Sequence, residues 1–282
     1  HSSAASDVYK RQVLEEFGAN NQKIKIKESA PKYYHPGRSG QILTEKGNIV
    51  ANFGEIHPKI MKEKMLKFVE IGQQSPPKRK KEERSEDFKE IYKEFINDKA
   101  KEQSSRCSQC GVPFCQVHCP LSNNIPDWLK LTAENRLEEA YHLSQSTNNM
   151  PEVCGRICPQ DRLCEGNCVI EQSGHGTVTI GSIEKYITEN AWEKGWIKPF
   201  EVSYEKKQSV GIIGAGPAGL ACAEDLRKLG YQITVYDRYD RAGGLLIYGI
   251  PNFKLEKYVV TRRTQLLKDS GINFVQNFEV GR

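Results

Sequence analysis

The chain has 282 residues, of which 38% are hydrophobic and 27% charged, and its formal net charge at pH 7 is +5. This length holds one large domain or two ordinary ones. The mean hydropathy is -0.62, and no apolar run is long enough to predict a membrane span. The basic run 78–81 is followed at once by acidic residues, which is typical of a solvated face rather than of a nucleic-acid site. We therefore expect a globular protein with neither a membrane nor a nucleic-acid partner.

The first part of the chain is unlike the rest. Residues 1–12 (HSSAASDVYKRQ) have no periodicity or targeting pattern and are typical of a vector scar or a disordered tail. In 13–64, strand-like segments meet at a turn around Gly47-Asn48. The flanking segments 32–40 (KYYHPGRSG) and 51–58 (ANFGEIHP) resemble part of the phenylalanyl-tRNA synthetase β subunit. The resemblance includes no ATP or amino-acid site, so we expect no aminoacylation. The functional-looking side chains there are interpreted as structural: His35, Arg38 and His57.

A natural start for the next part is Met61 or Met65, as if two reading frames had been joined. Residues 66–71 are predicted to form a short strand or cap. Apolar residues spaced i, i+3, i+4, i+7 predict an amphipathic helix over 85–95. Further helices are predicted from Pro126, over 135–143 and over 181–192. We therefore expect residues 65–205 to form an all-α module.

Eight of the nine cysteines lie in this module, in two blocks. The blocks have the spacings Cys107-x2-Cys110-x4-Cys115-x3-Cys119-Pro120 and Cys154-x3-Cys158-Pro159-x5-Cys164-x3-Cys168. Thiolates at such short spacings can converge on a soft metal centre. The pattern leaves three explanations, namely structural zinc, a disulfide framework or iron–sulfur clusters.

Disulfides fit poorly, because the chain is large, highly charged and shows no secretory segment before the cysteines. Zinc usually prefers Cys-x2-Cys pairs, and only Cys107 and Cys110 have that spacing. The longer spacings and the two Cys-Pro pairs favour iron–sulfur clusters, with a zinc-binding interaction module as the alternative. Clusters would then contribute to the folding free energy of a module that buries little apolar surface. Many reduced cysteines without an export signal indicate the cytoplasm.

A nucleotide-binding pattern begins at residue 210. An apolar strand over 210–213 precedes Gly214-Ala215-Gly216-Pro217-Ala218-Gly219, and a helix and a second strand ending at Asp237 follow. This order is typical of a dinucleotide-binding βαβ unit, in which glycines allow the turn, the approach of a pyrophosphate and close helix packing. The helix N-terminus offers N–H groups to the phosphate. An acidic residue at 237 accepts from ribose hydroxyls and favours FAD or NAD over NADP.

The paired glycines at 243–244 permit a second close approach to a cofactor. A helix over 255–267 and a strand over 272–275 follow, and Cys222 is expected to be a small buried residue. We assign residues 206–282 to an α/β Rossmann-type domain. Its candidate cofactor-binding residues are Gly214, Gly216, Pro217, Ala218, Gly219, Asp237, Arg238, Gly243, Gly244 and Leu245.

Four motifs in order carry a second resemblance. They are RCSQCGVPFC from 106, CGRICP from 154, GAGPAGLA from 214 and GGLLIYGIPNFKL from 243. Together they resemble the small (β) subunits of glutamate synthase, a family of NADPH-dependent FAD and iron–sulfur oxidoreductases. Dihydropyrimidine dehydrogenase (its N-terminal part) and the bifurcating ferredoxin:NADP oxidoreductase are related. The resemblance, from about residue 65 onward, implies an all-α iron–sulfur module followed by part of a Rossmann-type FAD domain.

The resemblance implies two 4Fe-4S clusters whose ligands cross between the blocks, whereas spacing alone would give each block its own cluster. One implied ligand set is Cys107, Cys110, Cys115 and Cys168, and the other is Cys119, Cys158, Cys164 and Glu184. Cys154 would be spare, and without the resemblance Glu184 would be interpreted as a solvated helix residue. Three arginines would offset the cluster charge, or else are plain surface charges: Arg106, Arg156 and Arg162.

The implied reaction starts with hydride transfer from NADPH to FAD. Single electrons then pass through the clusters to a large (α) subunit that carries FMN and makes glutamate from glutamine and 2-oxoglutarate. The family's NADPH-binding domain and the rest of its FAD domain have no counterpart here, so we expect a truncated fragment that does not turn over NADPH alone. The alternative acceptors are those of a bifurcating or a pyrimidine-reducing oxidoreductase.

Overall fold

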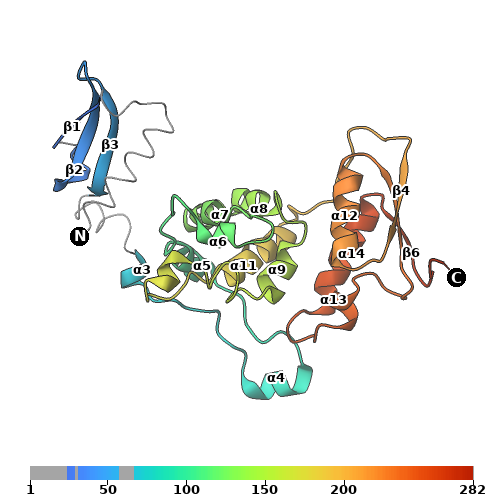
Figure 1. Cartoon of the computed structure of the whole chain (residues 1–282). Coiled ribbons are helices and arrows are strands. Elements are labelled where there is room, and N and C mark those ends of the chain that lie inside the picture. Colours follow the sequence, from blue (N-terminus) through green and yellow to red (C-terminus); the bar gives the residue numbers. More distant parts are fainter. Residues whose placement is uncertain (1–23, 29–30, 57–66, 282) are drawn as a thin grey trace. The chain divides into compact units, whose positions relative to one another are not determined.

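The computed structural model describes residues 24–28, 31–56 and 67–281. The chain folds as two compact units, His1–Leu66 and Lys67–Arg282 (Figure 1). None of the helices in the described ranges is long and apolar enough to cross a membrane. The prediction for residues 1–12 and the one for His57 fall outside these ranges. Each unit is considered on its own.

The first unit contains a three-stranded antiparallel sheet in the order β1-β2-β3. Its strands are β1 (Ile24–Lys27), β2 (Tyr34–Thr44) and β3 (Ile49–Ile56). Gly47 has φ +83, a conformation that glycine adopts without strain, and the Thr44 N–H donates to the Asn48 carbonyl at 2.9 Å. The predicted strand pair and its turn are confirmed. Of His35 and Arg38 only the backbone, in β2, is described.

The first part of the second unit is built from helices, with one isolated antiparallel bridge between Lys78 and Tyr92. The helices are α3 (Lys67–Glu70), α4 (Lys81–Asp87), α5 (Asn97–Ser104), α6 (Phe114–Val117), α7 (Ile125–Ala133), α8 (Leu137–Gln145), α9 (Pro151–Ile157), α10 (Val169–Gln172) and α11 (Ile180–Glu193). Pro126 lies in the first turn of α7, as predicted, because proline needs no N–H partner there. Trp128, Ile183 and Ile187 are fully buried, so the core of this part lies between α7 and α11.

Two predictions for the region before the cysteines are wrong. The predicted helix over 85–95 is absent, since α4 ends at Asp87 and Phe88 takes a left-handed φ of 50. After Phe88 the backbone forms hydrogen bonds to other segments of the chain instead of helical ones. One of them runs from the Ile91 N–H to the Phe253 carbonyl at 3.3 Å. Phe88 is 62% and Tyr92 41% exposed, whereas Phe95 is buried, so the helical spacing of apolar residues marks no continuous buried face there. Of the short strand or cap predicted over 66–71, the strand is wrong, since residues 67–70 form the short helix α3.

The last part of the second unit is a parallel sheet in the order β4-β5-β6 with helices between the strands. Its elements are β4 (Ser209–Ile213), α12 (Pro217–Lys228), β5 (Gln232–Tyr236), α13 (Leu245–Tyr248), α14 (Lys257–Asp269) and β6 (Asn273–Val275). This agrees with the predicted strand–helix–strand pattern. Cys222 is exposed on α12, so the prediction that it is buried is wrong. The buried face of α12 is formed by Leu220, Ala223 and Glu224, and Cys222 lies outside it.

Helix α9 links the helical part to the Rossmann part. Met150 and Val153 belong to the same buried cluster as Ala215 and Leu220 of the Gly-rich turn and α12. Beside them, the Glu152 carboxylate accepts two hydrogen bonds from Arg263 of α14, at 2.6 and 2.9 Å. The two parts of the second unit therefore share a core at α9.

Candidate metal centres and nucleotide site

The cysteines of the two blocks are sorted into two cavities, and the sorting crosses the blocks. The smaller cavity, about 20 Å³, is lined by Cys107, Cys110 and Cys115 from the first block and by Cys168 from the second. Cys107 follows α5, Cys115 lies in α6, and Cys168 is the residue before α10. Apolar residues such as Ile170 complete the wall. Four thiols thus face one apolar space.

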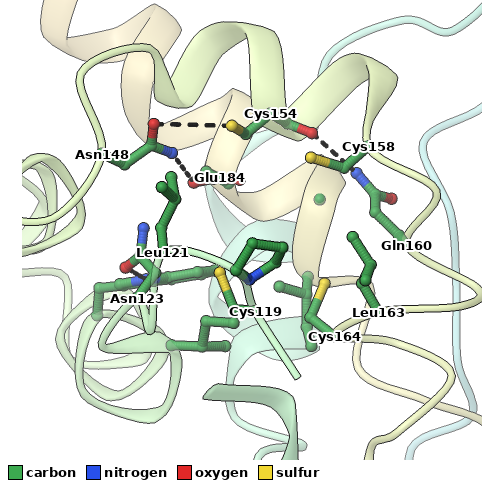
Figure 2. Close-up of a pocket in the computed structure, with 15 residues that line it drawn as sticks. Cys119, Leu121, Asn123, Asn148, Cys154, Cys158, Gln160, Leu163, Cys164 and Glu184 are labelled. Carbon is green, nitrogen blue, oxygen red and sulfur yellow. Dashed lines mark hydrogen bonds between the residues drawn. The ribbon is translucent and has the colours of Figure 1, made fainter. Parts of the chain in front are cut away.

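The larger cavity, about 180 Å³, collects donor groups from four segments (Figure 2). It is lined by Cys119 from the end of the first block, by Cys154, Cys158 and Cys164 from the second, and by Glu184 from α11. Glu184 is buried, so its alternative interpretation as a solvated helix residue is wrong. Cys154, which the resemblance left spare, lies on the same wall as the other thiols. The wall therefore presents five donor groups.

Burial determines the protonation of these groups. It raises the pKa of Cys107 to about 11 and that of Cys115 to about 12, and it also raises the pKa of Cys164. Burial likewise raises the pKa of Glu184 well above its usual range. Without a nearby cation these groups stay neutral, and iron would supply the charge that deprotonates them.

All nine cysteines are free thiols, and within the described ranges no three His, Cys, Asp or Glu side chains meet closely enough to hold a single metal ion. Four thiols surround one cavity, and four thiols with a carboxylate surround the other. Such donor sets have the softness that iron–sulfur clusters require. The residues present fit two clusters.

Asn148, which no sequence motif singled out, contacts two of the donor groups in the larger cavity (Figure 2). Its Nδ2 donates to Glu184 Oε1 at 3.1 Å, and its Oδ1 accepts from the Cys154 thiol at 3.6 Å. In the sequence, Asn148 had only the signal of a polar residue before a helix that starts with proline. Its importance depends on the fold.

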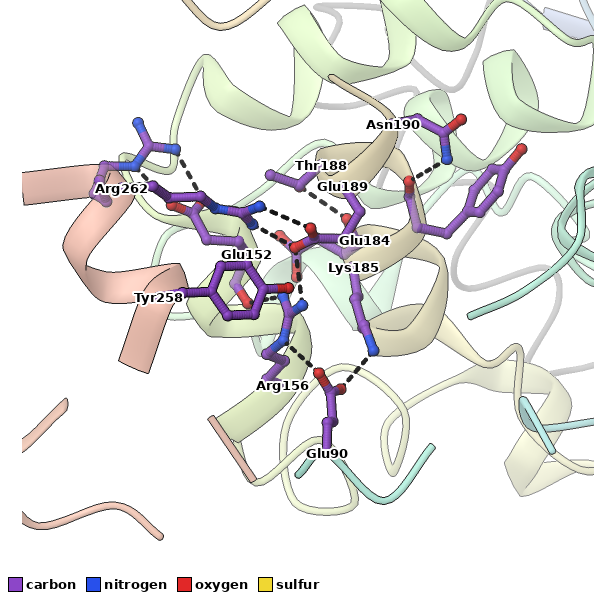
Figure 3. A network of polar contacts seen from close by, with 12 residues as sticks. Glu90, Glu152, Arg156, Glu184, Lys185, Thr188, Glu189, Asn190, Tyr258 and Arg262 are labelled. Atoms are coloured by element: carbon purple, nitrogen blue, oxygen red, sulfur yellow. Dashed lines mark hydrogen bonds and ion pairs between the residues drawn. The ribbon is translucent and has the colours of Figure 1, made fainter. Parts of the chain in front are cut away.

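Two of the three arginines proposed as counter-charges are buried. The Arg106 guanidinium donates only to backbone carbonyls, those of Ile71, His175, Gly176 and Thr177. Arg156 forms ion pairs with Glu90 at 3.1 Å and Glu189 at 2.8 Å (Figure 3). Plain surface charge is therefore the wrong interpretation for both, whereas Arg162 is exposed. Arg106, next to Cys107, is a buried cation without a carboxylate partner in the hydrogen bonds of its side chain.

The Gly-rich turn has the geometry of a phosphate site. Gly214 has φ +101, and a Cβ on Gly219 would lie 1.9 Å from the Gly214 carbonyl oxygen. Gly243 donates its N–H to the Ala215 carbonyl at 2.7 Å, which brings the second glycine pair beside the turn. A Cβ on Gly244 would lie 2.8 Å from the Gly216 Cα. The two glycine segments thus pack closely, backbone against backbone, at the start of α12.

The remaining predicted cofactor residues surround this turn. Pro217 and Ala218 form the exposed first turn of α12, and Leu245 is exposed at the start of α13. A pocket of about 400 Å³ next to them is lined by Gly214, Tyr236, Asp237, Arg238, Tyr239 and Phe278, among others. Three of the ten predicted residues line this pocket, namely Gly214, Asp237 and Arg238, and the other seven lie at the start of α12 or at the start of α13.

Asp237 has a structural role besides the predicted one. Its Oδ2 accepts from the Ala215 N–H at 2.6 Å, and its Oδ1 accepts from the Tyr239 N–H at 2.8 Å. The carboxylate is buried and holds the Gly-rich turn against the end of β5. A ribose hydroxyl would share these oxygens with the backbone donors.

Family models match three parts of the chain. The dihydropyrimidine dehydrogenase domain II model, a 4Fe-4S cluster domain, matches residues 84–196. The NAD(P)-binding Rossmann-like domain model matches residues 212–273. The phenylalanyl tRNA synthetase beta chain CLM domain model matches residues 8–91.

Curated relatives agree with the first two of these matches. The glutamate synthase (NADPH) small chain of Azospirillum brasilense is 68% identical over 220 residues, which are 78% of this chain and 46% of that protein. The matched part of this chain belongs to the glutamate synthase small-chain family. The small chain of Escherichia coli K12 is 49% identical over 79% of this chain and 47% of its own. The oxidoreductase AegA of the same strain is 48% identical over 73% of this chain and 31% of its own.

These matches confirm both resemblances, and this chain has an iron–sulfur domain and an NAD(P)-binding Rossmann-like domain. The chain spans about half the length of the small chains it matches. Among solved structures, a 6-hydroxypseudooxynicotine amine oxidase of Pseudomonas geniculata N1 matches with a TM-score of 0.27 and 17% identity, over 56% of this chain and 20% of that one. That likeness is too low to bear on fold or function.

Proposed function

We propose that this chain is the electron-transfer part of a glutamate synthase small subunit. In this proposal residues 65–205 hold two 4Fe-4S clusters, and residues 206–282 form the first half of an FAD site. One cluster is held by Cys107, Cys110, Cys115 and Cys168, and the other by Cys119, Cys158, Cys164 and Glu184. FAD, when bound, accepts a hydride and releases electrons one at a time.

The observation that carries this proposal is the crossed sorting of the cysteines into two cavities. It agrees with the ligand sets of the resemblance and differs from the simpler grouping by sequence block. A second support is the position of α9, which lines the larger cavity with Cys154 and packs Met150 and Val153 against the Rossmann core. A cluster and a flavin on opposite sides of one short helix are suitably placed for electron transfer.

The chain's own residues have defined tasks at the nucleotide site. The N–H groups at the start of α12 bind the pyrophosphate, and Asp237 holds the turn in position while it accepts from the ribose. Gly243 and Gly244 let the second glycine segment lie close to the turn, since a Cβ on Gly244 would lie 2.8 Å from the Gly216 Cα. The acidic residue at 237 favours FAD over a nucleotide with a 2′-phosphate.

In the complete enzyme, NADPH would reduce the flavin, and the clusters would deliver electrons to a large subunit that carries FMN. That subunit would form glutamate from glutamine and 2-oxoglutarate, in the cytoplasm, where thiols stay reduced. The relatives named for this activity support the proposal, since they are small chains of glutamate synthase.

The test is to purify the chain without oxygen, add FAD and reduce it with dithionite. We expect iron, inorganic sulfide and EPR signals of two reduced clusters. Mixing with a large subunit, glutamine and 2-oxoglutarate should reoxidise the chain and yield glutamate. Stoichiometric zinc without iron would overturn the cluster assignment.

A second acceptor is suggested by the 48% identity to AegA, an oxidoreductase. In that case the clusters and flavin would be the same, and the partner would be another redox protein. Failure of the large subunit to reoxidise a fully loaded, reduced chain would favour this alternative.

A further inference from the structure

The larger cavity has one more donor group than a 4Fe-4S cluster needs. A cubane cluster takes one protein ligand for each of its four irons, whereas the wall carries five donors: Cys119, Cys154, Cys158, Cys164 and Glu184. Cys119, Cys158 and Cys164 lie on segments apart from Asn148. The other two donors, Cys154 and Glu184, both contact it.

The orientation of the Asn148 amide is fixed by the backbone. The Met150 N–H, which can only donate, points at Asn148 Oδ1 at 3.0 Å. The amide oxygen must therefore face α9, where it also accepts from the Cys154 thiol. The Nδ2 group is left to face Glu184 Oε1. One side chain thus engages the thiol through its acceptor and the carboxylate through its donors (Figure 2).

The other two amides on this wall do not contact donor side chains in this way. Asn123 accepts from Trp128 Nε1 at 3.0 Å and donates to the Ser144 carbonyl. Gln160 donates to the backbone carbonyls of Cys154 and Gly155. Asn148 is buried, so solvent does not compete for its contacts.

We infer that Asn148 is a positioning residue that selects the fourth ligand of the larger cavity. It orients the Glu184 carboxylate toward the metal and holds the Cys154 thiol away from it. The inference rests on the proposed function, because it needs a cluster in this cavity. It adds that Cys154 is a latent ligand, and that its hydrogen bond to Asn148 Oδ1 keeps it from the metal.

When Asn148 is removed, Cys154 should replace Glu184. The bond from a Glu184 oxygen to iron breaks, a bond from the Cys154 sulfur forms, and the thiol proton passes to the released carboxylate. No electron is gained or lost in this exchange.

The main test is Asn148→Ser in the anaerobically purified chain. Serine can still accept from the Met150 N–H but is too short to hold both Glu184 and Cys154. We expect unchanged iron content and a changed EPR signal for one of the two clusters. Asn149→Ser is the matched control, because Asn149 donates to Asp225 on α12 and does not line the cavity. It should leave both signals as they are.

The dependence on Cys154 decides the inference. Cys154→Ser alone should leave both signals unchanged, whereas adding it to Asn148→Ser should abolish the changed signal. Asn148→Asp, which keeps the acceptor and removes the donor to Glu184, is the second variant if the first folds poorly.

Three results would overturn the inference. The signals of both Asn148 variants could match the wild type, the changed signal could survive Cys154→Ser, or the cluster could be lost in both variants. A wild-type chain without iron would instead overturn the proposed function, and this inference with it.

Discussion

At the scale of single residues, Cys164 and Cys168 illustrate how the site is made. Only three residues separate them, yet they line different cavities. Cys164 lies in the turns after α9, and Cys168 lies at the start of α10. A change of chain direction between them sends the two sulfurs to opposite sides.

This separation predicts different spectroscopic effects. Cys164→Ser should disturb the same EPR signal as Cys119→Ser, whereas Cys168→Ser should disturb the other signal, together with Cys110→Ser. Each variant should lose up to half of the iron. EPR and iron analysis of the four variants test this, with the exposed Cys222→Ser as a control expected to change nothing. Identical effects of Cys164→Ser and Cys168→Ser would contradict the crossed ligand sets.

Alanine substitutions at two glycines of the Gly-rich turn should have different effects, one on stability and the other on FAD binding. A Cβ on Gly219 would meet the Gly214 backbone oxygen at 1.9 Å, so Gly219→Ala should lower the free energy of unfolding. A Cβ on Gly216 has open space around it, with the Gly244 Cα 4.0 Å away, so Gly216→Ala should fold normally and bind FAD at least tenfold more weakly. Thermal unfolding of the cofactor-free chain and FAD titration separate the two. Normal FAD binding by Gly216→Ala would contradict the assigned phosphate site.

At the scale of elements, α9 connects the two halves of the second unit. Glu152 of this helix pairs with Arg263 of α14, and both side chains are fully buried. Further along, Arg156 and Arg262 meet on Glu189 of α11, so a polar network continues the junction (Figure 3). A buried pair whose partner is lost leaves an uncompensated charge.

Arg263→Met should therefore lower the free energy of unfolding by about 3–5 kcal/mol, because it strands the Glu152 carboxylate. The double change Glu152→Leu with Arg263→Met should recover much of this loss, since no charge then stays buried. Chemical denaturation measures both. Arg136→Met, which breaks an exposed pair with Glu139, is the control and should have no measurable effect. If the single variant Arg263→Met and the double variant unfold with equal free energies, the loss of stability does not come from the unpaired Glu152 carboxylate.

At the scale of the whole molecule, we expect the helical part to depend on the proposed clusters for its stability. Arg106 is buried beside Cys107 and bonds only to backbone carbonyls, through which it ties Ile71 to residues 175–177. A cluster with its thiolates would provide the anionic charge that this guanidinium lacks. The β1–β3 sheet belongs to the other compact unit, whose sequence contains no cysteine, so we expect no such dependence there.

Removal of iron by anaerobic chelation should therefore loosen the helical part. We expect amide hydrogen exchange in α5 and α10 to accelerate at least tenfold, because these helices flank the smaller cavity. Amides of the β1–β3 sheet serve as the internal control and should exchange at the same rate before and after the iron is removed. Unchanged exchange in α5 and α10 would show that the clusters contribute nothing to folding.

The sequence by itself determined the features that depend on short-range sterics. Gly47 specifies the turn between β2 and β3, and Pro126 specifies the first turn of α7. The Gly-rich motif between a strand and a helix predicted the nucleotide edge, because local geometry requires glycine at two of its positions: Gly214 takes a positive φ, and Gly219 has no room for a Cβ. The spacing of the cysteines predicted a soft metal centre, although the crossed ligand sets came from resemblance alone.

Only the tertiary structure decided which groups meet and which are buried. The apolar spacing around Phe88 predicted a helix that is absent, because backbone hydrogen bonds join residues 91–93 to Pro77, Arg79 and Phe253 and only Phe95 of that pattern is buried. Cys154, Glu184 and Asn148 come together from two helices and a loop, so no local pattern could relate them. Burial and contact depend on segments far apart in the chain, and their positions are fixed by the packing of the whole fold.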